Sequence, residues 1–146
     1  MEFSVLMTVY EKEKPYNLRK SLLTSYSQTI KPTEIVLVCD GELTQELYDE
    51  IDQIKSEIPI LQVYQLDTNM GSGPASRFGV EKCNTDLIAR MDSDDYSKEI
   101  RFEKQIKAFE ENPNLIMVGT NILEKNTEFT ALKTVPERTK EIREYS

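Results

Sequence analysis

The sequence predicts an α/β fold in which a mostly parallel sheet carries helices on both faces. Short β-rich runs alternate with longer helical patterns from residue 3 to residue 119, as they do in doubly wound sheets. Two runs, residues 35–38 and 115–118, are apolar at every position, which is typical of strands buried on both faces. We therefore expect each strand to pair with a parallel neighbour under a helical cover.

The first part of the chain predicts two strands and two helices. A strand over residues 3–9 precedes a helix from about residue 16 to 28, whose leucines recur at helical spacing and form one apolar face. A strand over 34–39 precedes a helix over about 44–57, which has a threonine at its start as a cap. Pro59 ends this helix.

The later part predicts three further strands, two helices and a glycine-rich turn. The strands are expected at residues 60–66, 87–91 and 115–119, the helices at about 75–83 and 98–111, and the turn at 71–74. In the last helix, Phe102, Ile106 and Phe109 fall on one face. Beyond residue 123 the sequence becomes polar and predicts no domain of its own.

Composition excludes several classes of function. The 146 residues suit a single domain that needs no disulfide, and the absence of histidine rules out His-based triads and HExxH zinc sites. The net charge of −8 has the wrong sign for an unassisted binder of nucleic acid or anionic membranes. Cys39 and Cys83 form no CxxC pair, so we expect buried thiols in a cytoplasmic protein. No apolar run near the start is long enough for a signal peptide or a membrane span.

Polar residues gather where the expected strands end, which is the edge at which α/β sheets bind ligands. The densest group is DSDD at residues 92–95, directly after the strand at 87–91. Its carboxylates repel one another when unpaired, so Asp92 and Asp94 predict a site for Mg²⁺ or Mn²⁺ with positions left open for phosphate oxygens. The alternative is a solvated acidic turn in which Asp94 or Asp95 caps the next helix.

The other strand ends allow two interpretations each. Asp40, which precedes Gly41, either forms a common Asp-Gly turn or accepts the ring N–H of a nucleobase. The loop at 69–74 (NMGSGP) is a weak phosphate-loop signal, because it matches neither GxGxxG nor the P-loop pattern. Arg77 faces a diphosphate or the acidic group at 92–95, or it lies in solvent as a surface arginine. Tyr10 either stacks on a base or packs on the sheet.

Several of these segments occur together in one order. They are 4–10 (SVLMTVY), 28–38 (QTIKPTEIVLV), 40–41 (DG), 69–71 (NMG), 90–95 (RMDSDD), 101–105 (RFEKQ), 111–113 (ENP) and 118–120 (VGT). The combination resembles the nucleotide-binding half of bacterial glycosyltransferase family 2 enzymes, which have the Rossmann-like GT-A fold, especially those that build O-antigen, capsule and other surface polysaccharides. The resemblance runs from about residue 3 to 123.

The resemblance implies roles for the matching residues. The implied nucleotide-binding residues are Thr8, Val9, Tyr10 and Asp40 at the uracil or other base, Gly71 beneath the nucleotide, Arg77 near the diphosphate, Asp92 at the ribose, and Ser93 within the same motif. The implied metal ligands are Asp92 and Asp94, which would hold Mn²⁺ or Mg²⁺ between the two phosphates. The chain departs from the family pattern at 76–78, where SRF replaces the frequent Ala-Arg-Asn.

The resemblance also implies a reaction. An acceptor hydroxyl would displace the nucleoside diphosphate from a sugar donor, with UDP as the expected nucleotide and with inversion, while the metal stabilises the leaving group. The acceptor would be a saccharide or a lipid-linked saccharide. We expect a nucleotide-sugar-binding half domain at 1–123 and a polar segment at 124–146 that leads to an absent acceptor-binding half. The general base is expected beyond Ser146, so no catalytic residue is assigned, and this chain alone is expected to be nearly inactive.

We expect no nucleic-acid partner. The sequence leaves open whether the protein forms a homodimer, and whether a longer protein is attached to the inner face of the cell membrane. A non-catalytic nucleotide-binding module would use the same residues as a transferase. A phosphatase of the haloacid dehalogenase type also carries a DxD pattern after a strand, although normally after the first strand.

Overall fold

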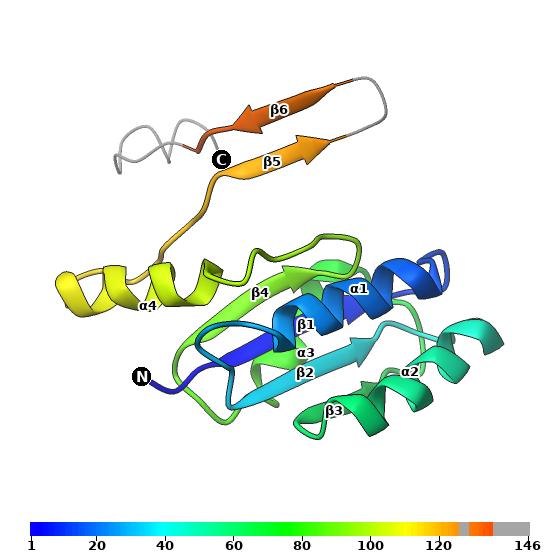
Figure 1. Ribbon diagram of the computed structural model, residues 1–146. Helices are drawn as coiled ribbons and strands as arrows, with labels where there is room; N and C mark the ends of the chain where they lie inside the picture. Colours follow the sequence, from blue (N-terminus) through cyan, green and yellow to red (C-terminus); the bar gives the residue numbers. More distant parts are fainter. Residues whose placement is uncertain (126–128, 136–146) are drawn as a thin grey trace. The chain divides into compact units, whose positions relative to one another are not determined.

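The computed structural model of the protein describes residues 1–125 and 129–135. Its elements (Figure 1) are β1 (Ser4–Val9), α1 (Pro15–Tyr26), β2 (Glu34–Cys39), α2 (Gln45–Glu57), β3 (Leu61–Gln65), α3 (Ser72–Val80), β4 (Ile88–Asp92), α4 (Arg101–Glu111), β5 (Ile122–Lys125) and β6 (Thr130–Lys133). The chain divides into two compact units, Met1–Lys104 and Gln105–Ser146. All of the candidate site residues belong to the first unit.

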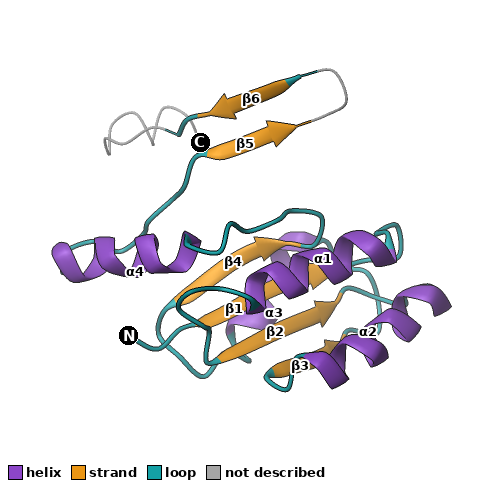
Figure 2. Cartoon of the chain, viewed as in Figure 1, coloured by secondary structure: helices purple, strands orange, loops and turns teal. Residues whose placement is uncertain are grey.

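The first unit is built on a four-stranded parallel sheet with the order β3-β2-β1-β4. Helices α1 and α2 cover one face and α3 covers the other (Figure 2). On the α3 side, Ala75 packs with Leu6, Val36 and Val38. Gly79 lets α3 approach closely, because a Cβ there would collide with Leu6. These features confirm the α/β fold with helices on both faces.

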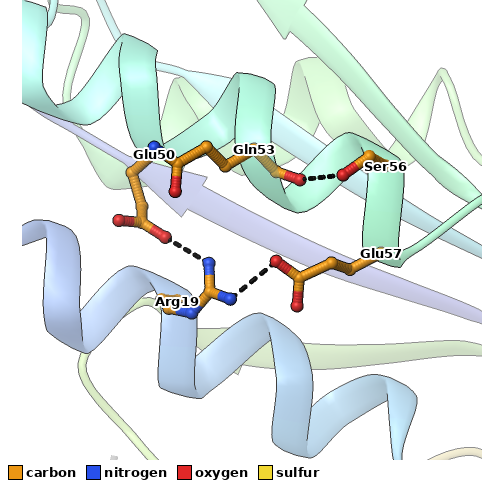
Figure 3. Close-up of polar contacts among 5 residues, drawn as sticks. All are labelled: Arg19, Glu50, Gln53, Ser56 and Glu57. Atoms are coloured by element: carbon orange, nitrogen blue, oxygen red, sulfur yellow. Dashed lines mark hydrogen bonds and ion pairs between the residues drawn. The ribbon is translucent and has the colours of Figure 1, made fainter.

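Ion pairs connect helices α1 and α2 on the other face of the sheet. Arg19 of α1 donates from Nη1 to Glu50 and from Nη2 to Glu57, both on α2 and both at 2.6 Å (Figure 3). Ser56 donates to the carbonyl oxygen of Gln53 within α2 at 2.6 Å. Because Arg19 and Glu57 remain partly exposed, this bridge adds little stability and serves mainly to orient α1 against α2.

Local signals located most of the helices and strands of the first unit correctly. The Thr44 hydroxyl accepts from the Leu47 N–H at 3.3 Å and caps α2 as expected. Gln28 lies just past α1 rather than inside it, and its side chain donates to the carbonyl oxygens of Thr24 and Lys98. The predicted thiols are both free: Cys39 is buried, whereas Cys83 is half-buried. Burial raises the pKa of the Cys39 thiol to about 11.

The predicted strand at 115–119 is wrong. The segment that follows α4 has no strand until β5, and Leu115, Ile116 and Met117 are exposed, Ile116 by 98%. An apolar run becomes a strand only when a neighbouring strand supplies backbone hydrogen bonds. No strand among the described residues pairs with this run, so its composition alone was misleading.

A hairpin in the second unit was missed. β5 pairs antiparallel with β6, in a register that places Leu123 opposite Leu132. Residues 126–128 and 136–146, which belong to the segment predicted as polar and without a domain, lie outside the described residues. The boundary predicted at residue 123 falls inside the second unit and stays a prediction. No helix in the described part of the chain is long and apolar enough to cross a bilayer.

Candidate functional site

The direction in which successive strands are added to the sheet reverses at β1. The chain passes from β1 to β2 and β3 on one side through α1 and α2, and then returns through α3 to β4 on the other side. Ligands of open α/β sheets bind outside the carboxyl ends of the strands at such a reversal. Thr8 near the end of β1 lies opposite Asp92, the last residue of β4. A predicted base contact and a predicted metal ligand are therefore neighbours.

Residues 92–95, called the acidic loop below, place their carboxylates in different surroundings. Asp92 forms an exposed ion pair with Arg90 at 3.1 Å. Asp94 makes no hydrogen bond or ion pair with any other residue that the structure describes. Burial raises the pKa of Asp95, and the charges of Asp94 and Asp92 raise it further, against the attraction of Arg101. The loop therefore concentrates negative charge, and the carboxylates of both Asp94 and Asp95 make no hydrogen bond or ion pair with the residues that the structure describes.

The donor set of Asp92 and Asp94 fits a divalent cation. Both residues are exposed, and Mg²⁺ is commonly held by one or two carboxylates together with substrate phosphates. Within residues 1–125 and 129–135, no group of three or more His, Cys, Asp or Glu side chains is arranged to hold a metal. A cation at this loop would therefore need further oxygen ligands from phosphate or water, so we expect metal and nucleotide to bind together.

The helix-capping alternative for the acidic loop is wrong. α4 begins at Arg101, so neither Asp94 nor Asp95 caps the helix that follows. The loop instead contains a turn in which the Asp95 N–H donates to the Asp92 carbonyl oxygen at 3.4 Å. The carboxylates of Asp94 and Asp95 are consequently not used to cap α4.

Arg101, the first residue of α4, bonds to residues that flank the acidic loop. Its Nη1 donates to Ser97 Oγ at 3.0 Å and to Met91 Sδ at 2.9 Å, and its Nη2 donates to the Arg90 carbonyl oxygen at 3.0 Å. Burial lowers the pKa of Arg101, and the charges of Asp95 and Asp92 oppose that shift. Arg101 therefore links the residues on the two sides of the acidic loop, Arg90 and Met91 before it and Ser97 after it.

Arg77 is not brought to the acidic loop. Its side chain is 86% exposed, and its ion pair is with Glu81, one turn later on α3, at 3.9 Å. The diphosphate contact implied for Arg77 stays a prediction, and it would require the side chain to leave Glu81.

Asp40 holds the glycine loop that precedes α3. The residue is buried, and its two carboxylate oxygens accept from the backbone N–H groups of Met70 at 2.7 Å and Gly71 at 3.0 Å. Gly71, with φ of 90°, is the N-cap of α3. Gly41 follows Asp40 with φ of 83°, as the Asp-Gly turn interpretation requires. A contact between Asp40 and a base stays a prediction. It would use lone pairs of the Asp40 carboxylate oxygens that are not engaged with Met70 and Gly71.

Replacing Gly41 by Ala is expected to lower the free energy of unfolding by about 2 kcal/mol. The backbone has a positive φ, and a Cβ would lie 2.5 Å from the backbone nitrogen of Asn69. Urea unfolding measures the change. Gly73→Ala is the matched control, because Gly73 lies in α3 with open space around it, so alanine should be neutral or stabilising there. Equal effects of the two variants would contradict this account of Gly41.

The residues at the end of β1 differ in their exposure to solvent. Tyr10 is 44% exposed and Thr8 is half-buried, whereas Val9 is 1% exposed. The Val9 carbonyl oxygen accepts from the Asp40 N–H at 2.8 Å. The side chain of Val9 is thus part of the core, and a base contact here, which stays a prediction, would fall to Tyr10 and Thr8.

The sequence did not reveal a contact between Glu13 and the acidic loop. Ser93, predicted among the nucleotide-binding residues, is buried and donates from Oγ to Glu13 Oε2 at 2.6 Å. Glu13 lies in the turn between β1 and α1, far from Ser93 in the chain, and no motif marks it. The only available signal was its position after β1, at the edge where the site was expected.

Comparison with known proteins finds relatives that are named as glycosyltransferases. The chain is 38% identical over 122 residues to the amylovoran biosynthesis glycosyltransferase AmsE of Erwinia amylovora, covering 84% of this chain and 46% of that protein. It is 40% identical over 102 residues to the UDP-Gal:alpha-D-GlcNAc-diphosphoundecaprenol beta-1,3-galactosyltransferase of Escherichia coli, covering 70% and 37%. The chain thus spans about half or less of the length of these relatives.

A solved structure supports the fold. The crystal structure of S. aureus TarS 1–349 in complex with UDP superposes with a TM-score of 0.66 at 23% identity, covering 77% of this chain and 33% of that chain. At this identity the similarity shows the fold, and the expected GT-A, Rossmann-like sheet is confirmed. The model of the family described as glycosyl transferase family 2 matches residues 4–144. This chain therefore belongs to glycosyl transferase family 2.

Proposed function

We infer that this chain forms the donor-binding part of a glycosyltransferase, which takes up a nucleoside-diphosphate sugar, UDP-linked, together with Mn²⁺ or Mg²⁺. The observation that carries this proposal is the acidic loop at the carboxyl end of β4, beside Thr8, with Asp94 left without a partner. The net charge of −8 makes a cation necessary, since an anionic chain repels a diphosphate. Asp92 and Asp94 would hold that cation.

The names of the relatives support the choice of substrates. One relative is named for a UDP-Gal donor and a diphosphoundecaprenol-linked acceptor, another for amylovoran biosynthesis, and TarS was solved with UDP. By analogy, the whole protein would transfer a sugar to a saccharide or lipid-linked saccharide during synthesis of a surface polysaccharide, with inversion at the anomeric carbon. The phosphatase alternative loses support, because the acidic motif follows β4 rather than β1.

The chain's own residues would perform the donor side of the reaction. Tyr10 and Thr8 would contact the base, and the loop held by Asp40 would pass beneath the nucleotide. A bound cation would act as a Lewis acid on the leaving diphosphate. Asp94, free of other partners, is available to hold it without breaking a protein contact. We expect the general base for the acceptor hydroxyl to come from outside residues 1–146.

A panel of nucleoside diphosphates tests the proposal. UDP with Mn²⁺ is expected to raise the melting temperature, because a ligand that binds only the folded state stabilises it, by about 1.4 kcal/mol at ten times the dissociation constant. EDTA should abolish the shift, and Mn²⁺ alone should produce a smaller one, since the loop needs phosphate oxygens to complete the coordination. Differential scanning fluorimetry gives the readout. An absence of any shift with all nucleoside diphosphates in manganese buffer would overturn the proposed function.

A further inference from the structure

We propose that Glu13 is a positioning residue that presets the acidic loop for its cation. Two bonds from Glu13 connect the start of α1 to the loop: Oε2 accepts from Ser93 Oγ at 2.6 Å, and Oε1 accepts from Asn17 Nδ2 at 3.2 Å. Oε1 also accepts from the Lys14 N–H at 2.8 Å, which fixes the carboxylate against the backbone. The inference rests on the proposed function, because it concerns the site at which the nucleotide and cation would bind.

Hydrogen bonds bracket the acidic loop on both sides of Asp94. Ser93 is anchored by Glu13, and the Tyr96 hydroxyl donates to Asn17 Oδ1 at 3.4 Å. Asn17 of α1 also bonds to Glu13 in the preceding turn, so the two anchors form one continuous network at the start of α1. Asp94 lies between them and takes no part.

A second contact from α1 fixes the backbone at the start of the loop. Ser21 is buried and donates from Oγ to the Asp92 carbonyl oxygen at 2.7 Å. The loop is therefore held through a main-chain oxygen, a serine and a tyrosine. None of these anchors uses the carboxylates of Asp92 or Asp94. The Asp92 carboxylate has only its exposed ion pair with Arg90, and that of Asp94 has no partner among the described residues.

These contacts hold the acidic loop through the Ser93 hydroxyl, the Tyr96 hydroxyl and the Asp92 carbonyl oxygen. The position of the loop therefore does not depend on bonds made by the carboxylates of Asp92 and Asp94. Groups that orient metal ligands without touching the metal commonly change metal affinity when they are altered. Glu13 is half-buried, and its carboxylate accepts from Ser93 Oγ at 2.6 Å, so it can serve as such a group.

Titration calorimetry of UDP with and without Mn²⁺ tests the proposal. Glu13→Ala is expected to weaken Mn²⁺-dependent UDP binding about 10-fold, with little effect on any binding in EDTA. Glu13→Gln should restore most of the affinity, because its amide nitrogen can donate to Ser93 Oγ while its amide oxygen still accepts from Lys14. If Glu13→Gln behaved like Glu13→Ala, Glu13 would act through its charge or as a ligand, and the proposal would be wrong.

A double-mutant cycle separates positioning from direct contact. Ser93→Ala should weaken Mn²⁺-dependent binding as much as Glu13→Ala, and the double variant should be no weaker than either, because both remove the same bond. Additive losses would mean that Ser93 contacts the nucleotide independently and would overturn the positioning role. Glu50→Ala is the control: it removes a carboxylate from the Arg19 bridge (Figure 3) and should leave UDP binding unchanged.

Amide hydrogen exchange of the ligand-free protein keeps this inference separate from the proposed function. Exchange at residues 93–96 should be faster in Glu13→Ala than in the wild type or Glu50→Ala, because the loop loses an anchor. Equal exchange in all three proteins would overturn the inference even if the wild type binds UDP. Absence of UDP binding by the wild type in Mn²⁺ would instead overturn the proposed function, and faster exchange in Glu13→Ala would still support the anchoring of the loop by Glu13.

Discussion

Replacing Asp94 by Asn is expected to weaken Mn²⁺-dependent UDP binding by about 100-fold, since loss of a direct ligand should cost at least as much as loss of an outer one. Asparagine keeps the shape of the side chain but removes the charge that would attract the cation. Asp94 has no other partner in the described part of the chain, so the substitution breaks no bond of the protein. Calorimetric titration of UDP in Mn²⁺ and in EDTA measures the loss directly.

The same substitution should leave the fold intact or stabilise it. Repulsion from Asp94 helps to raise the pKa of Asp95. A carboxyl group whose pKa is raised by folding makes the folded state less stable as pH rises through and above its ordinary pKa. Asp94→Asn removes that repulsion, so any gain in stability should be present near neutral pH and disappear in acid, where the wild-type carboxyls are protonated.

Asp86→Asn is the matched control for Asp94→Asn. Asp86 is exposed and lies before β4, at the opposite end of the strand from the acidic loop. The two substitutions change the net charge equally, so any general effect of charge on the attraction of UDP would appear in both. If both variants bound UDP with Mn²⁺ equally well, Asp94 would not be a metal ligand.

The sequence was informative where a local rule sufficed. Thr44 capped α2 as a threonine before a helix should, and the all-apolar run at 35–38 lies in β2, which is buried at every position. The equally apolar run at 115–118 is not a strand, because pairing depends on a neighbour that composition does not reveal. The Asp-Gly turn and the position of the acidic loop after a strand were also correct, since both follow from short-range patterns.

Contacts between distant segments could not be predicted. Nothing in the sequence indicates that Ser93 bonds to Glu13 or that Asp40 bonds to Met70 and Gly71. Each requires the strand order, which places the ends of β1, β2 and β4 on one edge. Glu34 shows the same limitation at the opposite edge, because it was predicted only as the start of a strand.

Glu34→Gln is expected to lower the free energy of unfolding by about 3 kcal/mol near neutral pH. The carboxylate of Glu34 is buried. Its Oε1 accepts from Ser4 Oγ at 2.6 Å and from the Asn84 N–H, and its Oε2 accepts from Asn84 Nδ2 at 2.7 Å and from Gln62 Nε2 at 3.0 Å. An amide has one acceptor oxygen, so its nitrogen would face two donors. The shape is unchanged, and the loss therefore measures hydrogen bonding rather than packing.

The pH dependence of this loss gives a stricter test. Burial alone would raise the pKa of Glu34, but the bonds from Asn84, Ser4 and Gln62 outweigh it and lower the pKa. A carboxyl group with a lowered pKa stabilises the fold fully above its ordinary pKa, and this contribution is lost as pH falls through the lowered value. The stability difference between the wild type and Glu34→Gln should therefore be largest near neutral pH and shrink below the ordinary carboxyl range.

Urea unfolding at about pH 7 and about pH 3 measures both stabilities. Glu42→Gln, at an exposed residue, is the control and should change stability little at either pH. A loss for Glu34→Gln that stays the same at both values would show that the charge of Glu34 is not involved. The bonds of Glu34 join β1, β3 and the turn before β4 around β2, at the end of the sheet opposite the acidic loop. Glu34→Gln should consequently lower stability while leaving the affinity of the folded protein for UDP and Mn²⁺ unchanged, which is the reverse of the result expected for Asp94→Asn.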